Sequence, residues 1–228
     1  MRLRIPENLT QRAYRAIRDE ILKGRLNGKQ RLTEAYFAER LGVSKSPIRE
    51  ALNRLEAEGL IIIEPRRGAS VANFSADDIK EIYELREILE GAAVHDMLMD
   101  EKTCARLRAS LDAAKEALRA SDKVAYILAD ADFHRVVAQA ARNSRLRRIL
   151  ENMHGQMLVL RHRTFELSSD RSVLEHEGIL QAIEGGDTDL ASRRMTQHVR
   201  AVRKKLLAHL ENAGTTDSEE PPAEAAAN

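Results

Sequence analysis

The stretch that decides the fold is residues 32–73, which read LTEAYFAERLGVSKSPIREALNRLEAEGLIIIEPRRGASVAN. Apolar side chains recur at helical spacing over residues 33–40 and again over residues 48–55. The Leu-Gly-Val sequence at 41–43 separates the two runs and is typical of a tight turn. The pattern therefore predicts a helix–turn–helix at the start of this stretch.

The second helix of this pair has a recognisable beginning, and a hairpin follows it. Ser44 has the side chain of an N-cap, and Pro47 is tolerated in the first turn, where backbone N–H groups have no helical partners. After Gly59, residues 60–63 and 69–71 read as two strands joined by Glu-Pro-Arg-Arg-Gly. A helix–turn–helix followed by a hairpin with a basic tip predicts a winged helix-turn-helix.

This shape suits a domain that reads double-stranded DNA. The first turn of the second helix would enter a major groove, where Lys45 and Arg49 reach guanine edges or phosphates. The arginines at the wing tip suit the phosphate backbone or an adjacent minor groove. The alternative is a small helical domain whose arginines are merely solvated. The residues expected to contact DNA are Ser44, Lys45, Ser46, Pro47, Arg49, Asn53, Arg66, Arg67 and Gly68.

The charge distribution favours DNA binding, although the net charge of +1 by itself does not. Residues 1–72 carry 15 Lys and Arg against 9 Asp and Glu, or +6, whereas residues 73–210 carry 22 of each. Residues 211–228 carry five acidic groups and no basic ones. The positive charge therefore lies in the segment that has the DNA-binding pattern.

Composition argues against a membrane or secreted protein. No apolar run approaches the ~20 residues that a membrane-spanning helix needs, and residues 1–10 lack the core of a signal peptide. The single cysteine, Cys104, cannot form an internal disulfide and fits a reducing compartment. We therefore expect a cytoplasmic protein with no membrane partner.

The rest of the chain reads almost entirely as helix. Apolar residues at helical spacing predict helices near 75–99, 107–118, 124–141, 146–165, 173–184 and 190–210. The loops between them are short, which favours antiparallel packing. We expect a mainly α protein with three parts: a winged helix-turn-helix at 1–73, an all-α six- or seven-helix antiparallel bundle at 74–211, and a disordered acidic tail at 212–228.

Four residues of the predicted bundle have the chemistry of a metal site. Asp130 and His134 are four apart on one helix and project from the same face, while His176 and His198 belong to two later helices. A carboxylate and three imidazoles from separate helices can converge on a divalent transition metal. The alternative is that these histidines lie on the surface or bond to backbone groups in the core.

Two segments of the chain resemble two known domain families. LGVSKSPIREALNRLEAEGLI, at 41–61, resembles the DNA-binding domain of the GntR family. The family commonly has arginine where this chain has Lys45, and lysine lacks the bidentate fork, so base discrimination there is expected to be weaker. ADADFHRVVAQAARNSRL, at 129–146, and LEHEGILQAIEGGDTDLASRRMTQHV, at 174–199, resemble the FCD (FadR C-terminal) ligand-binding domain that accompanies one large GntR subfamily.

The resemblance implies a set of metal ligands and an effector. Metal-binding FCD domains use an aspartate and a histidine four apart, then one histidine from each of two later helices. Those positions match Asp130, His134, His176 and His198. The metal implied is zinc, nickel or manganese, and the sequence does not choose among them. In such domains a small organic acid supplies oxygen ligands at the open metal positions.

Two arginines are candidates to bind the carboxylate of that effector. Arg86 lies where the family often has a pocket arginine, and would act as a bidentate clamp. The alternative for Arg86 is a surface residue paired with Glu90 one turn further along the helix. Arg161 is a further candidate, unless its segment forms a solvated helix face.

The leading hypothesis is a transcription regulator, in the usual family mode a repressor, rather than an enzyme. It would bind a palindromic operator as a homodimer and respond to a small carboxylate metabolite. A metal-dependent enzyme tethered to DNA is one alternative, but no Glu or Asp lies beside the ligand pair in an HExxH-like arrangement. A direct metal-ion sensor and a bundle merely stabilised by metal are further alternatives.

Overall fold

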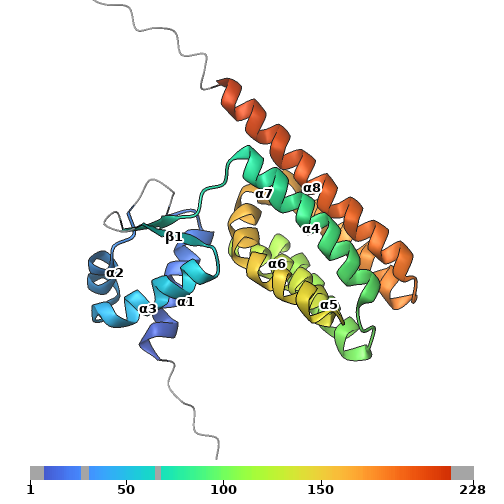
Figure 1. Ribbon diagram of the computed structural model, residues 1–228, viewed down its shortest axis with the longest axis horizontal. Coiled ribbons are helices and arrows are strands. Elements are labelled where there is room, and N and C mark those ends of the chain that lie inside the picture. Colours follow the sequence, from blue (N-terminus) through green and yellow to red (C-terminus); the bar gives the residue numbers. More distant parts are fainter. Residues whose placement is uncertain (1–7, 27–30, 65–67, 217–228) are drawn as a thin grey trace, which may run out of the picture.

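The computed structural model describes residues 8–26, 31–64 and 68–216, and Figure 1 shows them in two parts. The N-terminal part contains helices α1 (Leu9–Leu22), α2 (Glu34–Leu41) and α3 (Lys45–Ala57) and strands β1 (Ile61–Glu64) and β2 (Gly68–Val71). The longer C-terminal part contains helices α4 (Ala76–Asp96), α5 (Glu101–Arg119), α6 (Lys123–Ala140), α7 (Ser144–Glu184) and α8 (Thr188–Thr216). The predicted mainly α fold, with a winged helix-turn-helix before a helical bundle, is confirmed.

The helix–turn–helix forms where the sequence predicts it. Thr33 caps α2 by accepting a hydrogen bond from the backbone N–H of Tyr36. Gly42 ends α2 with a φ of 65°, a left-handed conformation that glycine adopts without strain. Ser44 is the N-cap residue of α3, although its side chain makes no capping hydrogen bond. The buried face of α3 consists of Ile48, Ala51, Leu52 and Leu55.

The wing is the antiparallel hairpin β1–β2. Ile61 pairs with Val71, and both side chains face the core of the N-terminal part together with Ala69. The predicted wing-tip residues Arg66 and Arg67 lie outside the described residues. The hairpin therefore supports the apolar side of α3 and leaves the opposite side of that helix open to solvent.

The described residues of the C-terminal part form a bundle of five helices, α4 to α8. Helix α4 begins at a capping box, in which Ser75 and Asp78 satisfy each other's backbone N–H groups. Figure 1 shows α4 and α8 side by side along the length of the bundle, with α5, α6 and α7 beside them. Among the described residues, no helix has the length and apolar character needed to cross a membrane.

Two boundaries differ from those predicted. The separate helices expected at 146–165 and 173–184 are one helix, since α7 runs without interruption for 41 residues. The segment between them, ELSSDRS, is polar but contains neither Gly nor Pro, so nothing in it stops a helix. The predicted tail begins too early at 212, because α8 continues to Thr216; residues 217–228 lie outside the described part of the chain.

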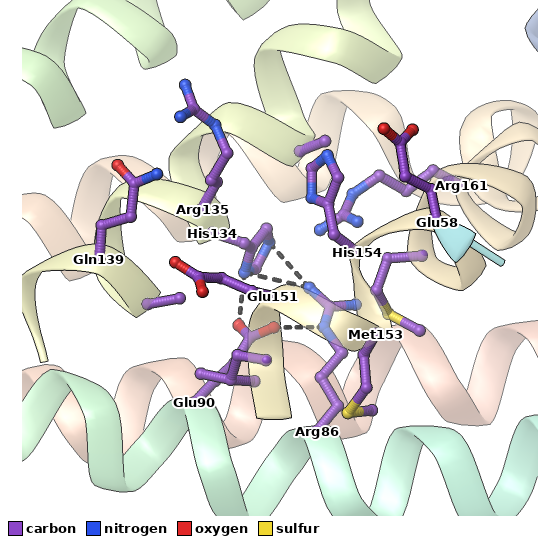
Figure 2. A pocket seen from close by; sticks show the side chains of 15 residues that line it. Glu58, Arg86, Glu90, His134, Arg135, Gln139, Glu151, Met153, His154 and Arg161 are labelled. Carbon is purple, nitrogen blue, oxygen red and sulfur yellow. Dashed lines mark hydrogen bonds and ion pairs between the residues drawn. The ribbon is translucent and has the colours of Figure 1, made fainter. Parts of the chain in front are cut away.

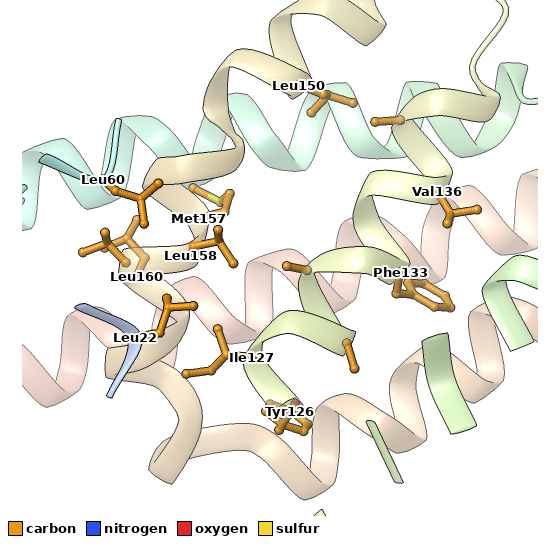
Figure 3. Packing of buried hydrophobic residues seen from close by; sticks show 14 of the residues in the cluster. Leu22, Leu60, Tyr126, Ile127, Phe133, Val136, Leu150, Met157, Leu158 and Leu160 are labelled. Carbon is orange, nitrogen blue, oxygen red and sulfur yellow. The ribbon is translucent and has the colours of Figure 1, made fainter. Parts of the chain in front are cut away.

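A single apolar cluster joins the two parts of the molecule. Leu22 and Leu60 of the winged domain belong to the same buried cluster as Ile127 of α6 and Leu158 and Leu160 of α7. Figure 3 shows Leu22 and Leu60 beside the segment of α7 that carries these leucines. The winged domain is therefore packed against the bundle and not merely tethered to it.

The two parts approach each other closely at a glycine of α7. A Cβ atom at Gly155 would lie 1.2 Å from the carbonyl oxygen of Glu58, the residue that caps the C-terminus of α3. Gly59 follows with a φ of 72° and lets the chain turn away from the contact. The end of α3 therefore touches the backbone of α7 directly.

Candidate metal and effector site

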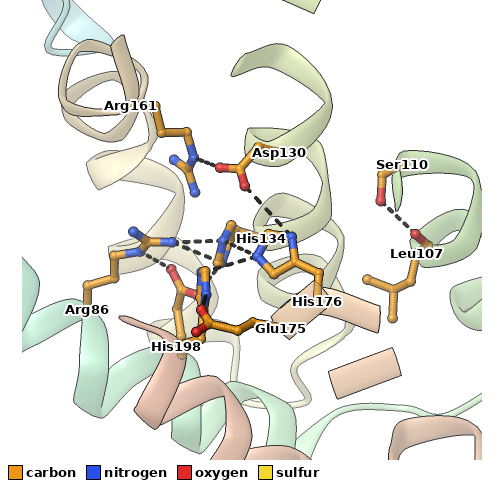
Figure 4. Close-up of polar contacts among 10 residues, drawn as sticks. Arg86, Leu107, Ser110, Asp130, His134, Arg161, Glu175, His176 and His198 are labelled. Carbon is orange, nitrogen blue, oxygen red and sulfur yellow. Dashed lines mark hydrogen bonds and ion pairs between the residues drawn. The ribbon is translucent and has the colours of Figure 1, made fainter. Parts of the chain in front are cut away.

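Three histidines from three different helices meet inside the bundle. His134 lies on α6, His176 on α7 and His198 on α8, and their exposed fractions are 6%, 1% and 3%. The Nε2 atom of His176 is 3.1 Å from Nε2 of His134 and 3.2 Å from Nε2 of His198. Figure 4 shows the three rings pointing toward one another. The structure thus brings together the three histidines that the sequence predicted as ligands.

Each of the outer two imidazoles is oriented by a carboxylate on its other nitrogen. Nδ1 of His134 donates to Glu90, and Nδ1 of His198 donates to Oε2 of Glu175 over 2.8 Å. A carboxylate only accepts, so these bonds place the proton on Nδ1 and the lone pair on Nε2 when the ring is neutral. Carboxylates in this position orient the histidine ligands of metal ions in many proteins.

Burial keeps His134 and His176 in the form that binds a metal. Removal from water lowers the pKa of His134 well below its usual value, and the nearby charges of Arg86 and Arg161 lower it further. Burial lowers the pKa of His176 to about 3, with the charge of His198 adding to the effect. Both imidazoles are therefore neutral near pH 7, and neutral imidazole is the metal-ligating form.

Two of the nitrogen–nitrogen separations in this cluster fit a shared metal ion, and all three nitrogens lie within 4.8 Å of one another. Two nitrogens that are each about 2.0–2.1 Å from one zinc ion lie about 2.9–3.4 Å apart for tetrahedral or octahedral angles. The observed separations of 3.1 and 3.2 Å fall within that range. Converging lone pairs repel one another unless a proton or a cation lies between them, so the donor set suits a divalent transition metal.

Asp130, the fourth predicted ligand, has a different partner in the structure. Its Oδ2 accepts a hydrogen bond from Nε of Arg161, and its Oδ1 is 3.7 Å from Nδ1 of His176. Burial favours the neutral acid, but Arg161 and the three neighbouring histidines together outweigh burial and hold the pKa of Asp130 well below its usual range. The carboxylate is therefore charged and borders the cluster, but it faces Nδ1 of His176 and not the converging Nε2 atoms.

Arg86 takes part in a buried ion pair beside the same cluster. Its Nε donates to Oε1 of Glu90 over 2.5 Å, and its Nη2 is 2.9 Å from Nε2 of His134. The partner weighed from the sequence was correct, but the pair is buried rather than on the surface, with side-chain exposures of 3% and 4%. Burial would lower the pKa of Arg86, but the charge of Glu90 raises it, so the guanidinium stays charged.

A cavity of about 310 Å³ opens beside this cluster. His134 and both predicted effector-binding arginines, Arg86 and Arg161, line it. Figure 2 shows these side chains around the cavity, together with residues of α7. The volume lies at the lower end of the range of small-molecule sites, which suits a ligand of few atoms.

Three polar residues of this region were not singled out from the sequence as site residues. Glu175 directly precedes His176, and Glu90 lies one turn after Arg86, so spacing alone offered a weak signal for both. Tyr83 lies one turn before Arg86 and is fully buried, and its hydroxyl has no hydrogen-bond partner among the described residues. A buried hydroxyl without a partner is costly, which is consistent with a polar ligand or water beside it.

The face of α3 that the sequence predicts to contact DNA is exposed. Ser44, Lys45, Ser46, Arg49 and Asn53 are exposed, Pro47 is partly buried, and Gly68 is exposed at the start of β2. Arg49 is not a free cation, because its guanidinium makes a two-point ion pair with Glu34 of α2. A winged helix-turn-helix whose second helix has an exposed basic face, packed on a helical bundle with an internal cavity, is the architecture of a DNA-binding transcription regulator.

Comparisons with known proteins place the chain within that class. Residues 9–71 match the family described as "Bacterial regulatory proteins, gntR family", and residues 81–201 match the FCD domain. The chain belongs to the GntR family and carries an FCD domain. These families are transcription regulators and not enzymes, which confirms the prediction that this protein is not an enzyme.

Curated relatives and solved structures agree with this assignment. The chain is 32% identical over 184 residues to the "Probable D-xylose utilization operon transcriptional repressor" of Paenarthrobacter nicotinovorans, covering 80% of this chain and 81% of the relative. It is 26% identical to the repressor RspR of Escherichia coli K12, covering 87% and 89%. A GntR regulator from Rhodococcus sp. RHA1 has a similar fold, with a TM-score of 0.74 at 24% identity over 87% of this chain and 97% of that one.

Proposed function

We propose that this regulator binds a small carboxylate metabolite beside a divalent transition metal held by His134, His176 and His198. The observation that carries the proposal is that one cavity contacts His134 and both buried arginines. A metal bound there would supply a Lewis acid with open positions for carboxylate oxygens. Asp130 is the proposed fourth ligand, which would require it to release Arg161.

The two arginines would hold the carboxylate of the effector. Each already pairs with a buried acid, Arg86 with Glu90 and Arg161 with Asp130. A guanidinium has more N–H donors than one carboxylate uses, so either arginine can bind a second carboxylate while it stays near the first. Both side chains are nearly fully buried, so such bonds form in a region of low dielectric and are strengthened.

The DNA-binding end would act as a repressor on a palindromic operator. Two-fold DNA symmetry is matched by a homodimer, so we propose that two copies bind one operator in the cytoplasm. Effector and operator affinities would be coupled, and the coupling must be equal in both directions. A direct metal-ion sensor is the alternative that the same histidine cluster allows.

The test is a thermal-shift screen of small mono-, di- and hydroxy-carboxylic acids on metal-loaded and chelator-treated protein. Some relatives are named for operons of gluconate and D-xylose utilisation, so sugar acids belong in the screen. A ligand at about 100 times its dissociation constant adds about 2.7 kcal/mol to the folded state. A stabilising acid that requires the metal supports the proposal. A large loss of stability on chelation, with no response to any acid, contradicts the effector and leaves the metal as a structural element or as the signal.

A further inference from the structure

One residue of the winged domain reaches the cavity of the bundle. Glu58 caps the C-terminus of α3, yet it lines the same cavity as Arg86, Arg161 and His134. Figure 2 shows Glu58 away from Glu90 and Arg86, on the side where a piece of the winged domain meets α7. The cavity is therefore closed partly by the domain that reads DNA.

The carboxylate of Glu58 is held within its own domain by two donors. Tyr14 of α1 donates to Oε2 over 2.6 Å, and Nε of Arg54 donates to Oε1 over 3.0 Å. The guanidinium of Arg54 also lies over the ring of Tyr14, 3.9 Å from its centroid. A carboxylate has more acceptor sites than these two bonds occupy, so Glu58 can still accept a hydrogen bond from the cavity.

The cavity consequently carries groups of opposite kinds. Arg86 and Arg161 are cationic and suit a carboxylate, whereas Glu58, on the opposite domain, is acidic and suits a hydroxyl or an ammonium group. Glu90 also lines the cavity, but its charge is matched by Arg86. A plain carboxylic acid would bind the cationic groups but would offer no hydrogen-bond donor to Glu58.

We propose that Glu58 is an effector-binding residue that accepts a hydrogen bond from a hydroxyl or ammonium group of the carboxylate effector. This inference rests on the proposed function and narrows its ligand class to hydroxy- or amino-carboxylic acids. The effector then spans the cavity from the arginines of the bundle to the end of α3. The hydroxyl or ammonium group of the effector competes with Tyr14 and Arg54 for the Glu58 carboxylate. Effector binding therefore alters the hydrogen bonds that link α1 to the end of α3.

The backbone around Glu58 explains why this contact affects DNA binding. The carbonyl of Glu58 lies against Gly155, so the end of α3 packs directly on this turn of α7. The neighbouring residues of α7, Glu151 and His154 among them, line the cavity. A ligand that draws Glu58 toward the cavity therefore changes the position of α3. Effector binding and DNA binding are coupled if the ligand contacts Glu58 better in one position of α3 than in the other.

The experiment compares matched ligand pairs on matched variants. Each pair is a short carboxylic acid with and without a hydroxyl or amino group, such as glycerate against propionate, measured by calorimetry on metal-loaded protein. The variants are Glu58→Gln, and Glu151→Gln as a control that removes a cavity carboxylate belonging to α7. Tyr14→Phe removes one competing donor and leaves Glu58 in place.

We expect wild-type protein to prefer the hydroxy or amino acid, and Glu58→Gln to lose that preference by about tenfold. Glu151→Gln keeps most of the preference, and Tyr14→Phe keeps or increases it. An unchanged preference in a folded Glu58→Gln protein that still binds plain acids overturns the role of Glu58 and leaves the proposed function standing. Failure of wild-type protein to bind any acid overturns the proposed function, and the inference with it.

Discussion

Arg49 and Glu34 form a two-point ion pair on the exposed face of α3, with Nε–Oε1 and Nη2–Oε2 distances of 2.6 and 2.8 Å. The pair links α3 to α2 and holds the guanidinium in one place, although 63% of the Arg49 side chain is exposed. Guanine presents two acceptors to the same fork that the carboxylate now occupies. An operator can therefore replace Glu34 at donors that are already aligned.

Replacing Arg49 with alanine should weaken operator binding by at least about tenfold, because one bidentate base contact is lost. The melting temperature should hardly change, since the side chain is exposed. Glu34→Gln serves as the paired variant, and should keep specific binding because Arg49 remains. Fluorescence anisotropy with specific and scrambled DNA at fixed salt makes the comparison. Equal operator affinity in wild-type and Arg49→Ala protein would remove α3 as the recognition helix.

Replacing His134 with alanine should lower the metal content, because one of three converging nitrogens is removed. Chelation should then lower the melting temperature of wild-type protein but leave the variant almost unaffected. His154→Ala is the matched control, because His154 lines the cavity but does not belong to the cluster of three. Metal per chain is measured by elemental analysis after dialysis. Full occupancy in His134→Ala protein would show that the metal binds elsewhere.

Replacing Glu175 with glutamine should weaken metal binding by about 10- to 100-fold, the usual effect of losing a carboxylate that orients a ligand. Glu175 accepts from Nδ1 of His198, and no other carboxylate contacts that nitrogen among the described residues. Glu177→Gln is the control on the same helix, where the carboxylate pairs with Lys115 instead. Competition with a chromophoric chelator measures both affinities, and equal values would leave Glu175 with no influence on the metal.

Replacing Glu90 with alanine should destabilise the protein by roughly 3–5 kcal/mol, because it leaves the buried Arg86 charge without its partner. The double variant Arg86→Met with Glu90→Leu should recover most of that loss, because it removes both charges. Urea unfolding without added metal or effector measures the two variants against wild type. If the single and double variants are equally unstable, the Arg86–Glu90 pair stabilises the fold through the packing of its side chains and not through its charges.

Replacing Gly155 with alanine should destabilise the contact between α7 and α3, because the new methyl group meets the backbone carbonyl of Glu58. The expected cost is about 1–3 kcal/mol or more, against the ~1 kcal/mol gain that alanine normally provides inside a helix. Gly178→Ala is the control, since its Cβ would meet only the end of the Arg194 side chain, at 3.3 Å. Thermal melting distinguishes the two, and a stabilised Gly155→Ala protein would contradict the close packing.

Local sequence signals predicted the elements, but not the contacts between distant residues. Helix periodicity, the Ser75 cap and the turn at Gly42 are local, so the winged domain and most of the bundle follow from them. The break predicted between residues 165 and 173 was wrong, because polar residues were taken for a loop where no residue stops the helix. Tertiary packing then decided in favour of one long α7.

At the candidate site, too, the sequence identified some residues and only the structure revealed others. His134, His176 and His198 were identified because their spacing matched a family pattern, and the structure brings them together. Glu90 and Glu175 act on the far nitrogens of those rings, at sequence separations of 44 and 23. No local pattern connects residues that far apart, so the orienting carboxylates emerge only from the packed helices.

The apolar cluster that Leu22 and Leu60 share with Ile127 and Leu160 limits how this regulator can be re-engineered. A hybrid regulator made by exchanging segments at residue 73 would place a foreign surface against α6 and α7. Part of the core belongs to both segments. The exchanged pieces would therefore fail to fold as independent modules unless the apolar residues of their contact surface were exchanged as well. Interchangeable parts in this molecule are therefore smaller than its two sequence domains, and the exposed DNA-facing residues of α3 are the safest unit to transplant.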